Sequence, residues 1–554
     1  MTEDADNTVL DLLLDRARQA WMRGDLAKTD VLVDQLLSLA PEGAFQAAAA
    51  LALRGGVAER RGDPALAIRC FRQALAWKGD EPDWYAGLGL ALRALGQQDA
   101  AQAAWTTALA IDPNHGDALF HMALMAAETG REDVAERWYH ETIQAQSNRV
   151  APRFNLGNLL ARQGRLDDAA AWLGTAVPRA KGAERAKIMT NLGVVQRRQG
   201  HLELAEMSQR AALVLDPDNA EAQFNLAAVL LAKGDYGEGF QAWRARLTQP
   251  GWLRSKPRPD LPEWQGDPLP PGSKVLVLAE QGAGDMIQML RFLPILSDQG
   301  VLPVIEVPPG MERLLAAQFE DPNGWSGSMV PYGALADQSD GTREVQAWVE
   351  AFDLPAVFTI TTPQDVSERF APQRYLRTPA GVQSTVSELL GAEPTARTYR
   401  IGLCWSGNPT FAENHIRAMP ANALEPLLRA LPADQVHWGS LQMGAPAAQL
   451  AVLTDQAAIE IADWAPGLSD WAVTAAVLER CDLIVTTDTG LAHLAGALGR
   501  PTALLLAAHC DWRWGQTGET TCWYPSLRLF RQRHLAQWTD PVSALVDALP
   551  DLLA

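Results

Sequence analysis

Cysteine, basic charge and long apolar runs are all scarce in this chain of 554 residues, and each shortage excludes a class of protein. Its five cysteines are scattered without a Cys-x-x-Cys pair, so we expect reduced, mostly structural thiols. The 66 acidic residues outnumber the 47 basic ones and give a formal net charge of −19. That excess argues against nucleic acid as the main partner, because binding a phosphate backbone needs a basic surface.

No apolar run approaches the roughly 20 residues that a membrane-spanning helix needs, so we expect no transmembrane segment. The N-terminal residues Met1–Asp6 are acidic and do not have the basic and then apolar layout of a signal peptide. We therefore expect a cytoplasmic protein. The chain is too long for a single hydrophobic core, so we expect two or three domains.

A repeat with a period of about 34 residues occupies most of the first half of the chain. The clearest unit begins at Pro82 and carries two aromatics, a Leu-Gly pair, small residues and a closing proline: Tyr85, Leu88, Gly89, Ala101, Trp105, Ala108 and Pro113. This is the tetratricopeptide layout, in which small residues let two antiparallel helices approach closely. The frame recurs near Ala48, Gly116, Val150, Ala186 and Ala220, after a degenerate unit that ends at Pro41. We count about seven units and predict an α-solenoid over residues 1–253.

Three asparagines share one position of this frame. Asn155, Asn191 and Asn225 each stand one residue before the Leu-Gly or Leu-Ala pair, so they should line the concave groove of the array. A carboxamide both donates and accepts hydrogen bonds, which suits gripping the backbone of a protein acceptor. The alternative is that each asparagine interacts only locally, since His121 and Gly87 interrupt the series.

A proline-rich segment over residues 254–272 predicts a domain boundary, with Trp252 and Trp264 available to pack it onto a surface. From Ser273 onward, strands and helices alternate in two successive blocks, 273–395 and 396–554. Each block begins with a strand, a glycine-containing loop and a helix, which predicts two Rossmann-like halves. Ligands bind such sheets at the carboxyl ends of the strands, so two facing halves should form a cleft. The predicted fold class is therefore α + α/β.

The loop Glu280–Asp285 follows the first strand of this region. Gly284 would let the backbone approach a ligand closely. Asp285 is either a general base that takes a proton from an acceptor hydroxyl or simply the cap of the following helix.

The turn Thr486–Ala495 joins an apolar strand to a helix. Free N–H groups and the positive end of the helix dipole make such a turn a ready anion site, although it could also be an ordinary turn. Thr489 and Gly490 form the turn, His493 lies just inside the helix, and Asp488 would contact ribose hydroxyls or orient the loop.

Two further loops complete the predicted donor site. Ser406 and Asn408 offer polar groups to a phosphate, and Arg417 offers charge; otherwise they form a plain surface loop. Trp512 could stack on a base or sugar while Arg513 adds charge, or both could serve packing between domains.

These four motifs together resemble those of bacterial tetratricopeptide–glycosyltransferase proteins. They are Glu280–Asp285 with Met286-Ile287-Gln288 and Arg291-Phe292, Trp405–Thr410, Asp488–Ala495 and Asp511–Trp514. The Gly-Asp and Asp-Thr-Gly-x-x-His blocks also resemble the lipopolysaccharide heptosyltransferases. The resemblance implies a GT-B fold without an essential metal or cofactor, a donor phosphate at the Asp488–His493 turn and a base at Asp285. One departure is Ala418, where relatives usually carry a hydroxyl after the residue matching Arg417.

The asparagine series resembles the asparagine ladder of O-linked N-acetylglucosamine transferases, and the whole layout resembles flagellin O-glycosyltransferases. That resemblance implies transfer of a sugar from a nucleotide sugar, such as CMP-pseudaminic acid or a related nonulosonic acid, to Ser or Thr of a protein acceptor such as flagellin. The alternatives are a tetratricopeptide scaffold with an inactive transferase-like domain and a heptosyltransferase-like enzyme that acts on a glycan.

Overall fold

The computed structural model describes residues 3–248, 258–280, 282–320, 324–333, 344–391, 398–409 and 414–554. The chain divides into two compact units, Met1–Val195 and Gln196–Ala554. Among the described residues, no helix is both long enough and apolar enough to cross a bilayer.

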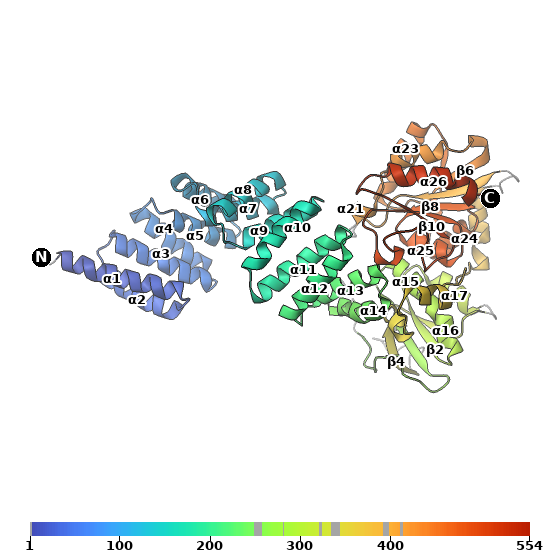
Figure 1. Cartoon of the computed structure of the whole chain (residues 1–554), viewed down its shortest axis with the longest axis horizontal. Coiled ribbons are helices and arrows are strands. Elements are labelled where there is room, and N and C mark those ends of the chain that lie inside the picture. The colour runs from blue at the N-terminus through green and yellow to red at the C-terminus, as the bar shows by residue number, and fades with distance from the viewer. Residues whose placement is uncertain are drawn as a thin grey trace. The chain divides into compact units, whose positions relative to one another are not determined.

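Fourteen described helices precede the sheets, which confirms the predicted repeats, and consecutive helices within each unit pack as pairs (Figure 1). The first unit contains α1 (Glu3–Met22), α2 (Leu26–Leu39), α3 (Phe45–Arg60), α4 (Pro64–Trp77), α5 (Pro82–Ala94), α6 (Gln98–Ile111), α7 (Gly116–Glu128), α8 (Glu132–Ala145), α9 (Ala151–Arg162), α10 (Leu166–Ala176) and most of α11 (Gly182–Arg198). The later repeat helices are α12 (Leu202–Leu215), α13 (Ala220–Lys233) and α14 (Tyr236–Trp243).

Glycine sets the geometry of each helix pair. The turn inside every pair contains a glycine with φ between 73° and 86°: Gly24, Gly62, Gly96, Gly130, Gly164, Gly200 and Gly234. Residues other than glycine rarely adopt a backbone conformation with such a positive φ. Within the pair α5 and α6, a Cβ added to Gly89 would lie 2.3 Å from Nε1 of Trp105, which donates to the Ala86 carbonyl at 3.1 Å. The Leu-Gly pair of the repeat therefore makes room for the aromatic of the second helix.

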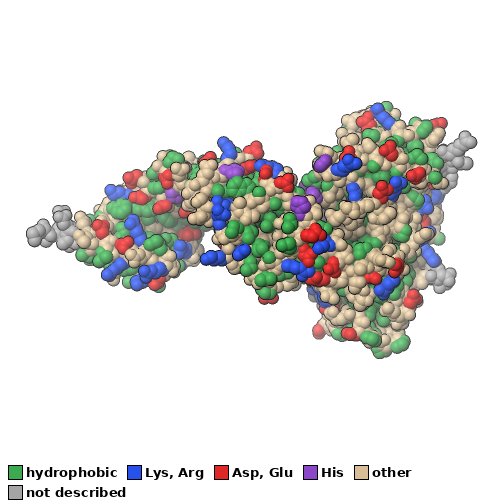
Figure 2. Space-filling view, in the orientation of Figure 1, with side chains coloured by type: hydrophobic (Ala, Val, Ile, Leu, Met, Phe, Trp, Pro, Cys, Tyr) green, Lys and Arg blue, Asp and Glu red, His purple; other side chains and the backbone are tan. Residues whose placement is uncertain are grey.

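Acidic and basic side chains are interspersed over the repeat helices on the face shown in Figure 2. Several of them pair between neighbouring repeats of the first unit. Arg93 contacts Glu128 at 2.5 Å, and Arg149 contacts Asp117 at 2.7 Å. Such exposed pairs each contribute little stability, so the buried faces of the helices hold the array together.

The second unit contains two parallel sheets in separate lobes (Figure 1). The first sheet has the order β3-β2-β1-β4 and the second the order β10-β9-β8-β5-β6-β7. Its strands are β1 (Lys274–Leu278), β2 (Leu302–Val307), β3 (Ser328–Pro331), β4 (Val345–Glu350), β5 (Tyr399–Cys404), β6 (Val436–Ser440), β7 (Ile461–Asp463), β8 (Leu483–Thr487), β9 (Thr502–Leu506) and β10 (Leu527–Arg531). The second order is that of a complete Rossmann sheet, and the first contains its first four strands. The GT-B prediction of two Rossmann-like halves is confirmed.

Helices cover these sheets, and short 3-10 turns connect them. The α-helices are α15 (Ala283–Met289), α16 (Leu293–Asp298), α17 (Glu312–Glu320), α18 (Leu354–Val357), α19 (Pro363–Arg369), α20 (Gln383–Leu390), α21 (Asn414–Arg417), α22 (Glu425–Leu428), α23 (Gln449–Ala457), α24 (Trp471–Glu479), α25 (Gly490–Ala497) and α26 (Thr539–Leu552). Side chains alternate between two cores along each strand. In β1, Val275 and Val277 face the largest core, whereas Leu276 and Leu278 face a smaller one on the other side.

The described part of the proline-rich segment packs onto the first sheet. The N–H of Trp264 donates to the Trp348 carbonyl at 2.7 Å, and the N–H of Trp348 donates to the Pro262 carbonyl at 3.0 Å. Trp264 is buried, and its indole donates to the Asp267 carbonyl at 2.8 Å. The predicted packing of Trp264 is therefore confirmed, whereas Trp252 lies outside the described residues.

The last repeat shares its core with the sheets. Tyr236, Phe240 and Trp243 of α14 belong to the same buried cluster as Val275 and Ile305. The predicted domain boundary at residue 253 falls outside the described residues and stays a prediction. Packing nevertheless joins α13 and α14 to the α/β part of the chain.

Candidate active site

The loop after β1 and the turn after β8 each adjoin the point in their sheet where the order of the strands reverses. β1 is paired with both β2 and β4, and β8 with both β5 and β9. The order of connection reverses between β1 and β4 and again between β5 and β8, and such reversal points are where parallel α/β sheets bind ligands. Three of the four predicted motifs follow β1, β5 or β8.

Asp285 lies in the first turn of α15 but does not cap it. The helix begins at Ala283, and its N-cap is Gly282, which has a φ of 83°. The alternative prediction that Asp285 is the N-cap is therefore wrong. A Cβ added to Gly282 would lie 2.6 Å from Oδ2 of Asp285, so the carboxylate folds back over a position that only glycine can occupy.

Helix α25 begins at Gly490, and the first backbone N–H groups of a helix have no partner within the helix itself. Its N-cap Thr489 is extended, and no side-chain hydrogen bond caps the helix. Instead, the Thr489 hydroxyl lies 3.1 Å from the Thr486 hydroxyl. The side chain of Thr489 therefore does not cap the first N–H groups of the predicted anion-binding turn.

The starts of α15 and α25 touch. A Cβ added to Gly284 would lie 2.7 Å from Cδ2 of His493 and 3.2 Å from Cα of Gly490. His493 is buried, its Nδ1 lies 2.8 Å from the Tyr524 hydroxyl, and burial lowers its pKa well below the usual value. His493 is therefore a neutral ring packed between the two halves, and its predicted contact with a donor stays a prediction.

Arg513 bridges the two halves at the same place. It belongs to the 3-10 turn η12 (Trp512–Trp514) after β9, and it contacts Asp285 at 2.9 Å and Asp511 at 3.5 Å. Burial raises the pKa of Asp285 to about 6; Arg513 opposes this rise, and the charges of Asp511, Glu280 and Asp488 add to it. Asp285 therefore combines a basicity suited to proton transfer near neutral pH with a cationic neighbour.

Asp488 is also buried at this site. Burial and the charge of Asp511 raise its pKa, while Arg417 and Arg513 lower it. Asp488, from the turn after β8, and Asp511, from the turn after β9, therefore both lie close to Arg513.

The loop after β5 is fixed by a residue that the sequence analysis did not identify. Oε1 of Gln442 accepts from the N–H groups of Trp405 and Ser406 at 3.0 and 2.8 Å. Its Nε2 donates to the Ser406 carbonyl at 3.0 Å. A Cβ added to Gly407 would lie 3.0 Å from a terminal nitrogen of Arg417, so this guanidinium covers the loop, while Asn408 is exposed. Thr410 lies outside the described residues.

Trp512 lies in an aromatic cluster and not on an open surface. Its ring centroid lies 5.6 Å from that of Phe240, 5.9 Å from that of Trp523 and 6.0 Å from that of Tyr236. Only 4% of Trp512 is exposed. This packing favours the structural alternative for Trp512, and its stacking on a donor stays a prediction.

The three asparagines of the repeats are half-buried. Nδ2 of Asn191 donates to Oδ1 of Asn158 at 2.9 Å, and Asn155 is hydrogen-bonded to the Tyr139 hydroxyl. Asn225 lies on α13 in the second unit. At least two of the three therefore have local partners, and the predicted contacts with a protein acceptor stay predictions.

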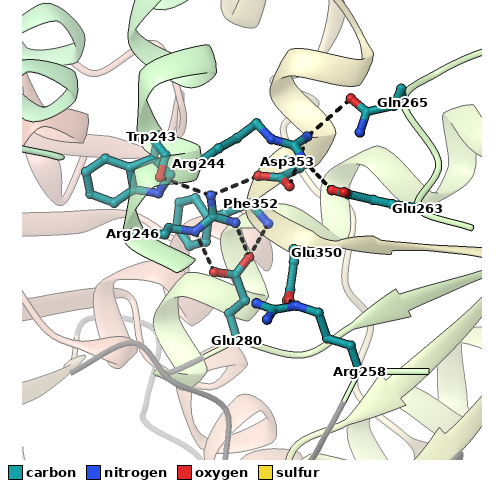
Figure 3. A network of polar contacts seen from close by, with 10 residues as sticks. All are labelled: Trp243, Arg244, Arg246, Arg258, Glu263, Gln265, Glu280, Glu350, Phe352 and Asp353. Atoms are coloured by element: carbon teal, nitrogen blue, oxygen red, sulfur yellow. Dashed lines mark hydrogen bonds and ion pairs between the residues drawn. The ribbon is translucent and has the colours of Figure 1, made fainter. Parts of the chain in front are cut away.

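A buried charge network anchors the start of the loop after β1 (Figure 3). Arg246, which follows α14 in the 3-10 turn η2 (Arg244–Thr248), contacts both oxygens of Glu280 at 2.7 and 2.8 Å and Asp353 at 2.8 Å. Glu280 also accepts from the N–H of Phe352 at 2.8 Å. The exposed fractions of the Arg246 and Glu280 side chains are 0% and 5%. No local sequence pattern indicates the role of Arg246, because its partners lie 34 and 107 residues away.

Two family patterns match the chain. Residues 447–529 match glycosyltransferase family 9 (heptosyltransferase), a range that includes the α25 turn and Arg513. Residues 86–150, 150–184 and 190–251 match the tetratricopeptide repeat. The chain therefore contains tetratricopeptide repeats followed by a stretch similar to the heptosyltransferase family of glycosyltransferases, as its motifs predicted.

Protein FlbA of Caulobacter vibrioides is 29% identical over 357 residues, which cover 61% of this chain and 56% of FlbA. The chain thus spans little more than half the length of this relative. Among solved structures, pilF of Pseudomonas aeruginosa is 16% identical and covers 40% of this chain and 97% of its own, with a TM-score of 0.35. PilW, a type IV pilus biogenesis factor, is 19% identical and covers 39% of this chain and 98% of its own, also with a TM-score of 0.35.

Proposed function

We propose that this chain is a protein O-glycosyltransferase that moves a sugar from a nucleotide-sugar donor to Ser or Thr of a protein acceptor. The observation that carries the proposal is the meeting of Asp285, the start of α25 and Arg513 at one point between the two Rossmann-like halves. The family 9 match over the second half supports the transferase chemistry.

The donor phosphate would sit at the first turn of α25, where free N–H groups and the helix dipole favour an anion. Arg417 and Arg513 would offset its charge without a metal or another cofactor, and Ser406, Asn408 and Thr489 would supply polar contacts. Asp488 would orient the turn or contact the ribose.

Asp285 would remove the proton from the acceptor hydroxyl as that oxygen attacks the anomeric carbon. The bond between this carbon and the phosphate oxygen breaks, and the nucleotide leaves with the electron pair. The start of α25 would stabilise the departing charge. The raised pKa of Asp285 supports this role, because a general base works best when its pKa lies near the working pH.

The finer identity of the substrates rests on the motif resemblance to flagellin glycosyltransferases. On that basis we propose a CMP-linked nonulosonic acid, such as CMP-pseudaminic acid, as donor and flagellin as acceptor. The repeats would recruit the acceptor, with Asn155, Asn191 and Asn225 as candidate contacts. Five free cysteines are compatible with the reducing cytoplasm, where we propose that the reaction occurs.

The direct test uses the purified chain with a panel of nucleotide sugars and flagellin, followed by intact mass measurement of the acceptor. Asp285→Asn should lower transfer by about 10²- to 10⁴-fold, the usual contribution of a general base. Asp547→Asn is the matched control, since Asp547 is exposed on α26. Full activity of Asp285→Asn would disprove the base assignment.

The heptosyltransferase description of the matched family supports a second candidate, a glycan acceptor. The same assay with a lipopolysaccharide core acceptor separates the two. Transfer to the glycan but not to any protein would favour this second function.

A further inference from the structure

Arg513 lies among three carboxylates. It contacts Asp285 from the first half and Asp511 from its own turn, and it lies close enough to Asp488 to lower the pKa of that carboxyl. Its side chain is only 10% exposed. Its Nε nevertheless has no hydrogen-bond partner among the residues that the structure describes. The guanidinium is thus buried, cationic and incompletely bonded.

The other charged groups near Asp285 are already engaged or uncharged. Glu280 is held by Arg246, Arg417 faces the turn that carries Asp488, and His493 is neutral because burial lowers its pKa. Arg513 is therefore the cation that decides whether Asp285 is held as a carboxylate. The charge of Arg513 lowers the pKa of both Asp488 and His493, which flank the start of α25.

We infer that Arg513 exchanges Asp285 for the donor phosphate, so that binding of the donor releases the catalytic base. This inference rests on the proposed function. Without a donor, the ion pair with Arg513 makes Asp285 less basic than its burial alone would make it. A phosphate at the start of α25 offers Arg513 a charged, bidentate partner. Asp285 then loses its cation while the nearby negative charge increases, and both changes make it more basic.

The exchange predicts the order in which the donor and the acceptor bind. An acceptor hydroxyl that arrives before the donor meets a base occupied by Arg513. An acceptor that arrives after the donor meets a base of raised basicity. Donor binding should therefore precede productive acceptor binding, and the enzyme should not activate a hydroxyl or water while the donor site is empty.

Isothermal titration calorimetry on the full chain tests this through the proton balance of binding. CMP, UDP, GDP, dTDP and ADP are titrated at pH 6.5 in two buffers with different ionisation enthalpies. We expect a net uptake of roughly half a proton per bound nucleotide, because the pKa of Asp285 rises when Arg513 leaves it. Asp285→Asn should bind the nucleotide but lose this uptake, and its remaining signal measures protonation of the phosphate itself.

Variants of Arg513 test whether Arg513 is the cation that leaves Asp285 when the nucleotide binds. Arg513→Gln should bind nucleotide at least tenfold more weakly and take up fewer protons, because its Asp285 is already without a cation. Arg513→Lys keeps the charge and should retain part of the uptake, which separates exchange from a folding defect; melting curves confirm that each variant is folded.

The outcomes are distinct. Nucleotide binding with equal proton uptake in the wild type and Asp285→Asn would overturn the exchange and leave donor binding intact. No binding of any of the five nucleotides would overturn the proposed function and this inference together.

Discussion

Gly284 shows how strongly one absent side chain constrains the site. Its position between α15 and α25 leaves no room for a methyl group, since His493 and the Gly490 backbone occupy that space. A methyl there would push the two motif helices apart and move Asp285 with them. The sequence analysis predicted that this glycine lets the backbone approach a ligand, which stays a prediction, and the structure shows that it also lets one half approach the other.

We therefore predict that Gly284→Ala destabilises the chain by about 1–3 kcal/mol, the usual cost of overpacking. Transfer activity should fall at least tenfold, because Asp285 is one residue away. Gly174→Ala is the matched control: it lies in α10 with open space around its added methyl, and it should be neutral or slightly stabilising. Chemical denaturation measures both, and equal stabilities would contradict the contact.

The raised pKa of Asp285 also predicts a stability change with pH. The folded state holds the Asp285 proton more tightly than the unfolded state, so the cost of ionisation grows as pH rises from about 4 through about 6. Asp285→Asn removes this cost. It should raise the melting temperature at pH 8 by about 1–3 °C and have little effect at pH 4. A lower melting temperature of Asp285→Asn at pH 8 would show that the pKa is lowered instead.

At the scale of elements, the order of strands and helices around the motifs was predictable. Apolar runs such as Leu483-Ile484-Val485 alternate with turns and amphipathic segments, and these gave β1, β2, β5, β6, β8 and β9. The sequence analysis missed β3, β4, β7 and β10, and of these β4 and β10 contain polar residues such as Gln346, Arg528 and Arg531. All four lie at sheet edges, where half the backbone groups need no neighbour and the apolar pattern weakens.

The network around Arg246 was not predictable, because it joins three separate elements through buried charges. We predict that Arg246→Met destabilises the second unit by about 3–5 kcal/mol, since it leaves Glu280 and Asp353 buried without their cation. Arg210→Met is the matched control; Arg210 pairs with Glu206 and Glu238 on the surface, and its loss should cost about 1 kcal/mol or less. Urea melts compare the two.

A double variant tests the origin of this cost. Glu280→Gln in the Arg246→Met background should recover part of the lost stability, because it removes one of the unpaired charges. Additive effects of the two substitutions would show that Arg246 acts by packing alone.

At the scale of the whole molecule, the seven repeats are not equivalent. The first unit has its own cores, whereas α14 contributes Tyr236, Phe240 and Trp243 to the core of the transferase. The period of the sequence revealed the number of repeats but not this difference, because every unit obeys the same frame. The motifs of the site were predictable from the sequence. The contacts that join them across the two Rossmann-like halves, such as that of Asp285 with Arg513, were not.

Two truncations should separate these roles. Removal of residues 1–181 keeps α11 to α14 and should leave a folded chain that still binds nucleotide. Removal of residues 1–250 also removes three core aromatics and Arg246, and truncation of each such aromatic alone costs roughly 3–5 kcal/mol. We expect this shorter chain to be insoluble or unfolded by circular dichroism. A folded, nucleotide-binding product would contradict the shared core.

The union of α14 with the transferase core also bears on how such chains can diversify. A repeat inserted or lost before the final pair changes the length of the array, and each unit needs only its neighbours for support. The final pair has no such freedom, because its inner face is matched to aromatic side chains of the enzyme. Under the proposed function, acceptor preference would vary by recombination among the earlier repeats, while the final pair and the α/β part are inherited as one piece.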